Sequence, residues 1–80
     1  MARSVEEIIA AALQLRPVDV TDDAEMTSLE GWDSLGHVNL MLELELEFGI
    51  TIDEAAVLSL TSVRAIRAFV AARISEDQGT

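Results

Sequence analysis

The sequence contains no cysteine, no lysine and no tyrosine, and it has a single proline. Without cysteine, disulfides, thiolate nucleophiles and cysteine-based zinc sites are excluded together. Of the residue types that usually activate a serine nucleophile by accepting its proton, the chain has only one histidine, His37. This argues against a serine that catalyses a reaction by itself. No apolar run approaches the length of a membrane span, and none follows a basic start at the N-terminus. We therefore expect a cytoplasmic protein that is not embedded in a membrane.

Positive charge is also scarce, because fifteen acidic residues face five basic ones, all of them arginine. Between Pro17 and Thr61 the chain has many acidic residues and no arginine or lysine. Such a surface repels nucleic acid and anionic membranes and favours partners with basic patches. Acidity on its own also keeps a small protein soluble, so the charge suggests a kind of partner without establishing one.

The length and composition predict one small all-α domain. Eighty residues, half of them hydrophobic, support a modest core and no deep catalytic pocket. With only two phenylalanines and one tryptophan, that core must consist mainly of aliphatic side chains packed between helices. We expect a single domain over residues 1–80, ordered from about residue 4 to about residue 75, and monomeric.

Helix signals predict a bundle of three main helices and one short helix. Ser4 and Glu7 have capping-box spacing, Pro17 stops the first helix, and Gly49 is a typical C-terminal glycine. The long stretch from Val18 to Trp32 lacks a clear period and is expected to be a loop that the core anchors. The predicted helices cover Val5–Leu15, Ser34–Phe48, about Asp53–Ala56, and a last segment capped by Thr61 and Ser62.

The segment Ser34–Phe48 is predicted to be a helix, although part of it also has the alternating pattern of a β-strand. Leu42 to Phe48 alternates strictly between apolar and acidic residues, but leucine, methionine and glutamate are strong helix formers. At 100° per residue one side is predicted to be buried, namely Leu35, Val38, Met41 and Leu42. The opposite side is predicted to be a polar face of Asn39, Glu43 and Glu47.

The start of this helix holds the candidate functional residue. Asp33 is a typical N-cap, which places Ser34 in the first turn, where backbone N–H groups lack intrahelical partners and the helix dipole is positive. A phosphate ester on the Ser34 hydroxyl would suit that environment. His37 lies one turn away, but no third group or nucleophile-elbow glycines accompany it, so a catalytic dyad is not expected.

Gly31-Trp-Asp-Ser-Leu35, followed by a helix that ends in Leu46-Glu-Phe-Gly-Ile50, resembles the acyl carrier protein family over almost the whole chain. The resemblance implies that a phosphopantetheinyl transferase moves 4′-phosphopantetheine from coenzyme A onto Ser34, with Asp33 and Leu35 as flanking determinants. The thiol of this arm would hold an acyl or aminoacyl cargo as a thioester. It also implies a non-catalytic carrier that serves a cargo-loading ligase and acyl or aminoacyl transferases of a biosynthetic pathway.

The second helix is the docking surface that the resemblance implies. The expected contact positions are Gly36, Asn39, Glu43, Leu46 and Glu47. Typical fatty-acid carriers have acids at the positions matching Gly36, Asn39 and usually Leu46, and this chain does not. Gly36 is similar to the glycine of D-alanyl carriers, and Trp-Asp-Ser-Leu resembles stand-alone bacterial carriers outside bulk lipid synthesis. Gly36 is either a tolerated poor helix former or room for a partner or the arm, while Trp32 is a core plug that could also flank the arm.

Two other classes remain open at this point. The first is a calcium-binding loop, because acceptors occur at positions 1, 3, 5, 7 and 12 of an EF-hand-like segment, namely Asp19, Thr21, Asp23, Glu25 and Glu30. Ala24 replaces the glycine required at its sixth position, and Gly31 follows where a helix should run. The second is an acidic helical adaptor for basic partners, in which Ser34 would be no more than part of a helix start.

Overall fold

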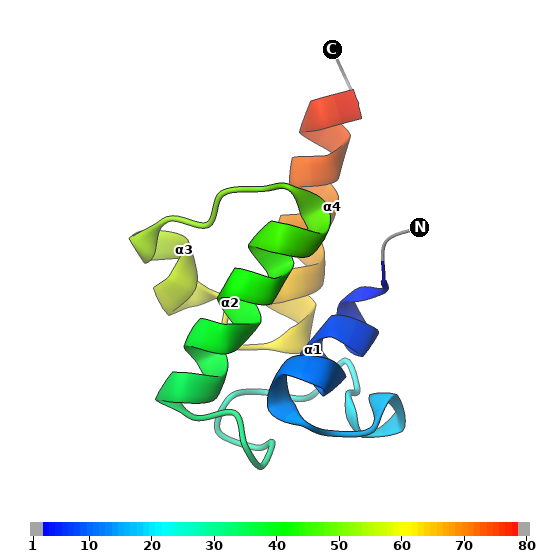
Figure 1. Ribbon diagram of the computed structural model, residues 1–80, viewed down its shortest axis with the longest axis vertical. Coiled ribbons are helices and arrows are strands. Elements are labelled where there is room, and N and C mark those ends of the chain that lie inside the picture. Colours follow the sequence, from blue (N-terminus) through cyan, green and yellow to red (C-terminus); the bar gives the residue numbers. More distant parts are fainter. Residues whose placement is uncertain (1–2, 79–80) are drawn as a thin grey trace.

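The computed structural model describes residues 3–78, which form four α-helices, a short 3-10 helix and no strand beyond an isolated bridge. The elements in order are α1 (Val5–Leu13), η1 (Pro17–Asp19), α2 (Ser34–Phe48), α3 (Glu54–Ser59) and α4 (Val63–Gln78). In Figure 1, α1 and α3 lie on opposite sides of α2, and α4 lies behind it. The predicted all-α bundle of three main helices and one short helix is confirmed.

α1 begins where the sequence predicted and ends earlier. The Ser4 hydroxyl accepts a hydrogen bond from the Glu7 backbone, and the Glu7 carboxylate accepts one from the Ser4 N–H. The predicted end was Leu15, but Gln14 takes a left-handed conformation with φ of 59° and closes the helix at Leu13. Leu15 then donates its N–H to the carbonyl of Ala10, which completes the turn. The chain therefore turns away before Pro17 is reached.

The long segment between α1 and α2 is more structured than the predicted loop. Its first residues form η1, and Glu25 makes an isolated antiparallel bridge with Ser62. The Met26 N–H donates to Thr61 at 2.9 Å, and the Val63 N–H donates to Ala24 at 3.1 Å. These bonds attach the loop to the connection between α3 and α4. The loop passes the end of the bundle where α2 begins (Figure 1).

α2 has the predicted bounds, but the prediction of its buried face was wrong. Asp33 caps its start and Gly49 ends it with φ of 63°. The buried residues are Gly36, His37, Leu40, Met41 and Leu44. Of the side predicted to be buried, only Met41 is, whereas Leu35, Val38 and Leu42 are exposed. α2 has more apolar residues than one face can bury, so its rotation is set by packing against the rest of the bundle.

α3 and α4 follow local capping signals. The Asp53 carboxylate accepts from the Ala56 N–H at 2.8 Å, and the Ser62 hydroxyl accepts from the Ala65 N–H at 3.1 Å. α3 extends past the predicted Ala56 to Ser59, and α4 runs beyond Ser75 to Gln78, while residues 79 and 80 lie outside the described residues. The largest fully buried side chains are Ile8, Ile9, Leu40, Leu44, Val63 and Ile66.

The aliphatic core predicted from composition is therefore observed between α1, α2 and α4. None of the described helices combines the length and apolar character needed to cross a membrane.

Candidate functional site

Ser34 is the first residue of α2 and is exposed. The cap of this helix is supplied by its neighbour, because Asp33 Oδ1 accepts from the Gly36 N–H at 2.8 Å and the Asp33 carbonyl accepts from the His37 N–H at 2.8 Å. The Ser34 hydroxyl therefore has no part in holding the helix together. It lies at the solvent-exposed start of a helix that Asp33 caps.

The surroundings of Ser34 suit a covalently attached phosphate ester. Gly36 and His37 give their N–H groups to Asp33, so the N–H groups of Ser34 and Leu35 are the orphan donors of the first turn. With the positive end of the helix dipole, they favour negative charge at this position. The side chain of Leu35 is 72% exposed and adds an apolar surface directly beside the serine. These residues fit a phosphate ester whose attached chain includes apolar groups beside its polar ones.

Below this site, Trp32 and His37 form a buried hydrogen-bonded pair. Trp32 Nε1–H donates to His37 Nδ1 at 2.9 Å, and the two rings stack with centroids 6.1 Å apart. His37 Nε2 lies 2.7 Å from the carbonyl oxygen of Val57 in α3. Because Nδ1 accepts, Nε2 must carry the proton and donate to Val57. The pair thus connects the loop, α2 and α3.

This arrangement settles two open interpretations from the sequence. His37 is only 6% exposed and both ring nitrogens are engaged, so it is no relay for Ser34. The Trp32 side chain is 2% exposed, so it is a core residue beneath the loop and does not lie beside a group attached at the surface. No local pattern signals the third member, Val57, because its carbonyl oxygen contacts His37 from a helix twenty positions along the chain.

Gly36 was predicted to contact partners, and the structure places it in the interior of the domain. The residue is buried, and a Cβ added to it would lie 2.3 Å from the carbonyl oxygen of Gly31 and 3.0 Å from Leu13 Cδ2. The glycine is therefore required for close packing of α2 against the loop and α1. Both sequence interpretations, a tolerated poor helix former and room for a partner or the arm, miss this reason.

Gly36→Ala is expected to destabilise the domain by about 1–3 kcal/mol, because the backbone of the loop must move to admit the methyl group. Glycine to alanine within a helix is ordinarily stabilising by up to about 1 kcal/mol, so the expected sign is reversed here. Urea unfolding followed by circular dichroism measures the change. The matched control is Asn39→Ala at an exposed position of α2, which should be neutral or slightly stabilising. Equal or greater stability of Gly36→Ala would contradict the packing described.

Three of the five predicted docking positions, Asn39, Glu43 and Leu46, line a groove between α1 and α2. Asn39 and Leu46 are exposed, Leu46 by 80%, whereas Glu43 and Glu47 are only half-buried. The groove has a volume of about 390 Å³ and is lined by Ala11, Ala12, Asn39, Leu42, Glu43 and Leu46. The expected polar face of α2 therefore turns toward α1.

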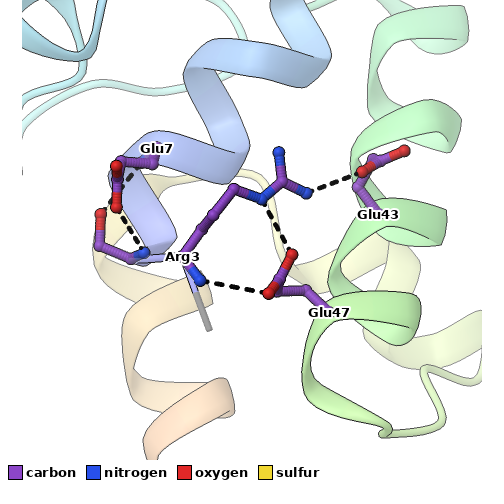
Figure 2. Close-up of polar contacts among 5 residues, drawn as sticks. Arg3, Glu7, Glu43 and Glu47 are labelled. Atoms are coloured by element: carbon purple, nitrogen blue, oxygen red, sulfur yellow. Dashed lines mark hydrogen bonds and ion pairs between the residues drawn. The ribbon is translucent and has the colours of Figure 1, made fainter. Parts of the chain in front are cut away.

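Glu43 and Glu47 are bound by Arg3, a residue that the sequence interpretation did not single out (Figure 2). Hydrogen bonds from the Arg3 side chain and backbone hold the pKa of the Glu47 carboxyl below its usual range. Hydrogen bonds to Glu47 and Glu43 in turn raise the pKa of the Arg3 guanidinium. No local pattern signals this contact, because Arg3 and Glu47 are 44 positions apart.

The residues proposed for a calcium loop do not come together. Asp19 pairs with Arg16 at 3.3 Å, and Asp23 pairs with Arg64 at 3.8 Å. Over residues 3–74, no group of three or more histidine, aspartate or glutamate side chains is placed to hold a metal ion. The segment begins in η1 and bridges to Ser62 instead of forming a compact chelating loop. The geometry gives the EF-hand alternative no support.

The described residues thus form a small helical bundle with an exposed serine in the first turn of a capped helix. Residues 3–70 match the family model described as a phosphopantetheine attachment site. The chain is 35% identical over 60 residues to polyketide-8 synthase acyl carrier protein 2 of Streptomyces avermitilis, which covers 75% of this chain and 69% of that protein. It is 32% identical over 66 residues to the acyl carrier protein of Thermotoga maritima, which covers 82% of each.

The chain therefore belongs to the acyl carrier protein family, whose cofactor is covalently bound 4′-phosphopantetheine. Membership implies interaction with a phosphopantetheinyl transferase and with the synthase enzymes that the carrier serves.

Proposed function

We propose that Ser34 is the attachment point of 4′-phosphopantetheine and that the chain carries an acyl or aminoacyl cargo on this arm, without catalytic activity of its own. The observation that carries the proposal is the position of the Ser34 hydroxyl, exposed in the first turn of α2 and not used in the helix cap. The bound group supplies a terminal thiol on which a cargo is held as a thioester. This explains how a chain without cysteine can take part in thioester chemistry.

Each residue at the site has a separate task in this proposal. Ser34 provides the oxygen that bonds to the phosphate, and the first-turn N–H groups of Ser34 and Leu35 stabilise its negative charge. Asp33 fixes the backbone at the start of α2 through its bond to Gly36. The exposed side chain of Leu35 offers an apolar contact to the arm or to the transferase. The buried Trp32–His37 pair holds the loop that leads into the site.

The surface of α2 supports a cargo and partners outside bulk fatty-acid synthesis. Gly36 is buried, and the positions of Asn39 and Leu46 bear no charge, so the acids that fatty-acid enzymes read are missing. The match to an acyl carrier of a polyketide synthase favours an acyl cargo among the two classes. We expect the ligase that loads the cargo and the transferases that accept it to dock on the exposed side of α2. The carrier acts in this scheme as a monomer in the cytoplasm.

The test is modification of the purified chain by coenzyme A and a broad-specificity phosphopantetheinyl transferase. We expect the intact mass to rise by one phosphopantetheine group and peptide mapping to place the addition on the peptide containing Ser34. Ser59, an exposed serine in α3, serves as an internal comparison and should remain unmodified. Failure of several active transferases to change the mass would refute the carrier proposal and favour the acidic adaptor.

A further inference from the structure

We infer that Arg3 determines partner specificity by occupying the α2 carboxylates that a cationic partner would otherwise bind. The inference rests on the proposed carrier function, in which partners dock on α2, and it names the chemistry of that contact. With its charges satisfied internally, α2 selects a partner that contributes an apolar surface. Arg3 is a positioning and specificity residue here, not a catalytic one.

The contact between Arg3 and α2 consists of three hydrogen bonds. Arg3 Nε donates to Glu47 Oε1 at 2.9 Å, Arg3 Nη2 donates to Glu43 Oε2 at 3.0 Å, and the backbone N–H of Arg3 donates to Glu47 Oε2 at 3.2 Å. In Figure 2 the side chain extends from the start of α1 toward α2 and ends between the two carboxylates. One guanidinium thus spans two acids that are four residues apart on the same helix face.

The remaining glutamate of α2 is also engaged within the chain. Glu45 Oε2 accepts a hydrogen bond from the Ile52 N–H at 2.7 Å, which ties the residues after Gly49 back to the helix. All three glutamates of α2 therefore have partners inside the domain. The sequence looks strongly acidic here, but these carboxylates are already paired. A cationic partner that binds Glu43 or Glu47 must compete with Arg3 for these carboxylates.

The exposed surface of α2 is apolar instead. Four exposed aliphatic side chains follow one another along α2 at spacings of three or four residues, beginning directly after Ser34. We call them the apolar stripe, which consists of Leu35, Val38, Leu42 and Leu46. Each of these side chains is at least half exposed, and Leu46 reaches 80%. A row of aliphatic side chains of this kind gains affinity by burial against an apolar partner surface. The paired carboxylates on its flank add little to that affinity.

The Arg3 contact is accessible enough to be displaced. The side chains of Arg3 and Glu43 remain 40% and 44% exposed, and Glu47 remains 21% exposed. Ion pairs of this kind contribute little to stability but do alter which charges are available to a partner. The ion pairs of Arg16, Arg64 and Arg67 are formed with residues outside α2. Arg3 is therefore the residue to change.

The test compares two synthetic helical peptides with the same leucine face, one carrying two arginines four residues apart and the other carrying glutamines there. Binding is followed by shifts of the α2 amide signals in nuclear magnetic resonance at low salt. Wild type should bind both peptides with similar Kd values. Arg3→Gln should bind the arginine peptide about three- to tenfold more tightly than wild type, as expected for two newly available exposed ion pairs. This gain should largely disappear at high salt.

The matched control is Arg64→Gln, which makes the same change in net charge at the exposed pair with Asp23. It should leave the preference between the peptides as in wild type. Glu43→Gln should have little effect in wild type and should remove much of the gain in the Arg3→Gln background. Equal behaviour of the two arginine variants, or an equal effect of Glu43→Gln in both backgrounds, would overturn the inference.

A pH titration shows independently whether the contact exists in solution. Arg3 holds the pKa of Glu47 down, so the contact stabilises the domain above the ordinary glutamate value of about 4.3, and this contribution is lost as the pH falls through the lowered value. In Arg3→Gln the pKa of Glu47 should rise. An unchanged pKa would refute the contact. Both measurements use the unmodified chain, so failure of Ser34 modification would refute the carrier proposal without deciding this one.

Discussion

Replacing Ser34 by alanine is expected to abolish addition of phosphopantetheine while leaving the melting temperature nearly unchanged. The substitution removes the only oxygen that we assign to the phosphate ester. It removes no structural hydrogen bond, because Asp33 supplies the cap through its carboxylate and its carbonyl. Alanine is also a good helix former, so the substitution should not disturb the start of α2. Intact mass after treatment with coenzyme A and transferase, together with thermal melting by circular dichroism, measures both effects.

Two controls separate the loss of the hydroxyl from a loss of structure. Ser59→Ala removes another exposed hydroxyl and should leave modification complete. Asp33→Ala removes the cap instead and should destabilise the domain by about 1 kcal/mol, whereas Asp33→Asn should retain most of the cap. A mass gain that persists in Ser34→Ala would place the attachment elsewhere. Loss of modification together with unfolding would show that Ser34 has a structural role that the structure does not assign to it.

The second large effect concerns the buried pair of Trp32 and His37. Trp32→Phe should destabilise the domain by about 2–4 kcal/mol, because it removes ring volume from the core and leaves His37 Nδ1 without its donor. His37→Phe should cost a similar amount, because it leaves both Trp32 Nε1–H and the Val57 carbonyl unpaired. These are large fractions of the roughly 5–15 kcal/mol that stabilises a typical domain.

The double variant distinguishes a hydrogen-bonded pair from two independent core residues. If the bond is responsible, the two losses should not add, because removing both partners avoids a buried unpaired group. Urea unfolding followed by far-ultraviolet circular dichroism gives the four free energies of the cycle. Leu58→Ala, at a side chain 74% exposed in α3, should change stability by less than about 0.5 kcal/mol. Additive losses in the double variant would contradict a direct interaction.

The helix starts and the candidate attachment serine could be read from the sequence because their causes are local. Ser4, Asp33 and Asp53 each bond to an N–H three residues ahead, and Gly49 ends α2 by its own backbone freedom. Contacts of this kind are fully specified within one helical turn. The position of Ser34 next to a capping aspartate follows from the same local rule. That is why the bounds of α2 and the place of Ser34 in its first turn were predicted correctly, while the attachment of a group to Ser34 stays a prediction.

The rotation of α2, the pairing of its acids and the role of Gly36 were decided only by the tertiary structure. Leucines occur around much of α2, so its own periodicity could not select Leu40 and Leu44 for the core over Leu35 and Leu42. Packing against α1 and α4 made that choice. The same packing brings Gly36 against the Gly31 carbonyl and Arg3 between two glutamates of α2. Such contacts join residues far apart in the chain, and no local pattern specifies them.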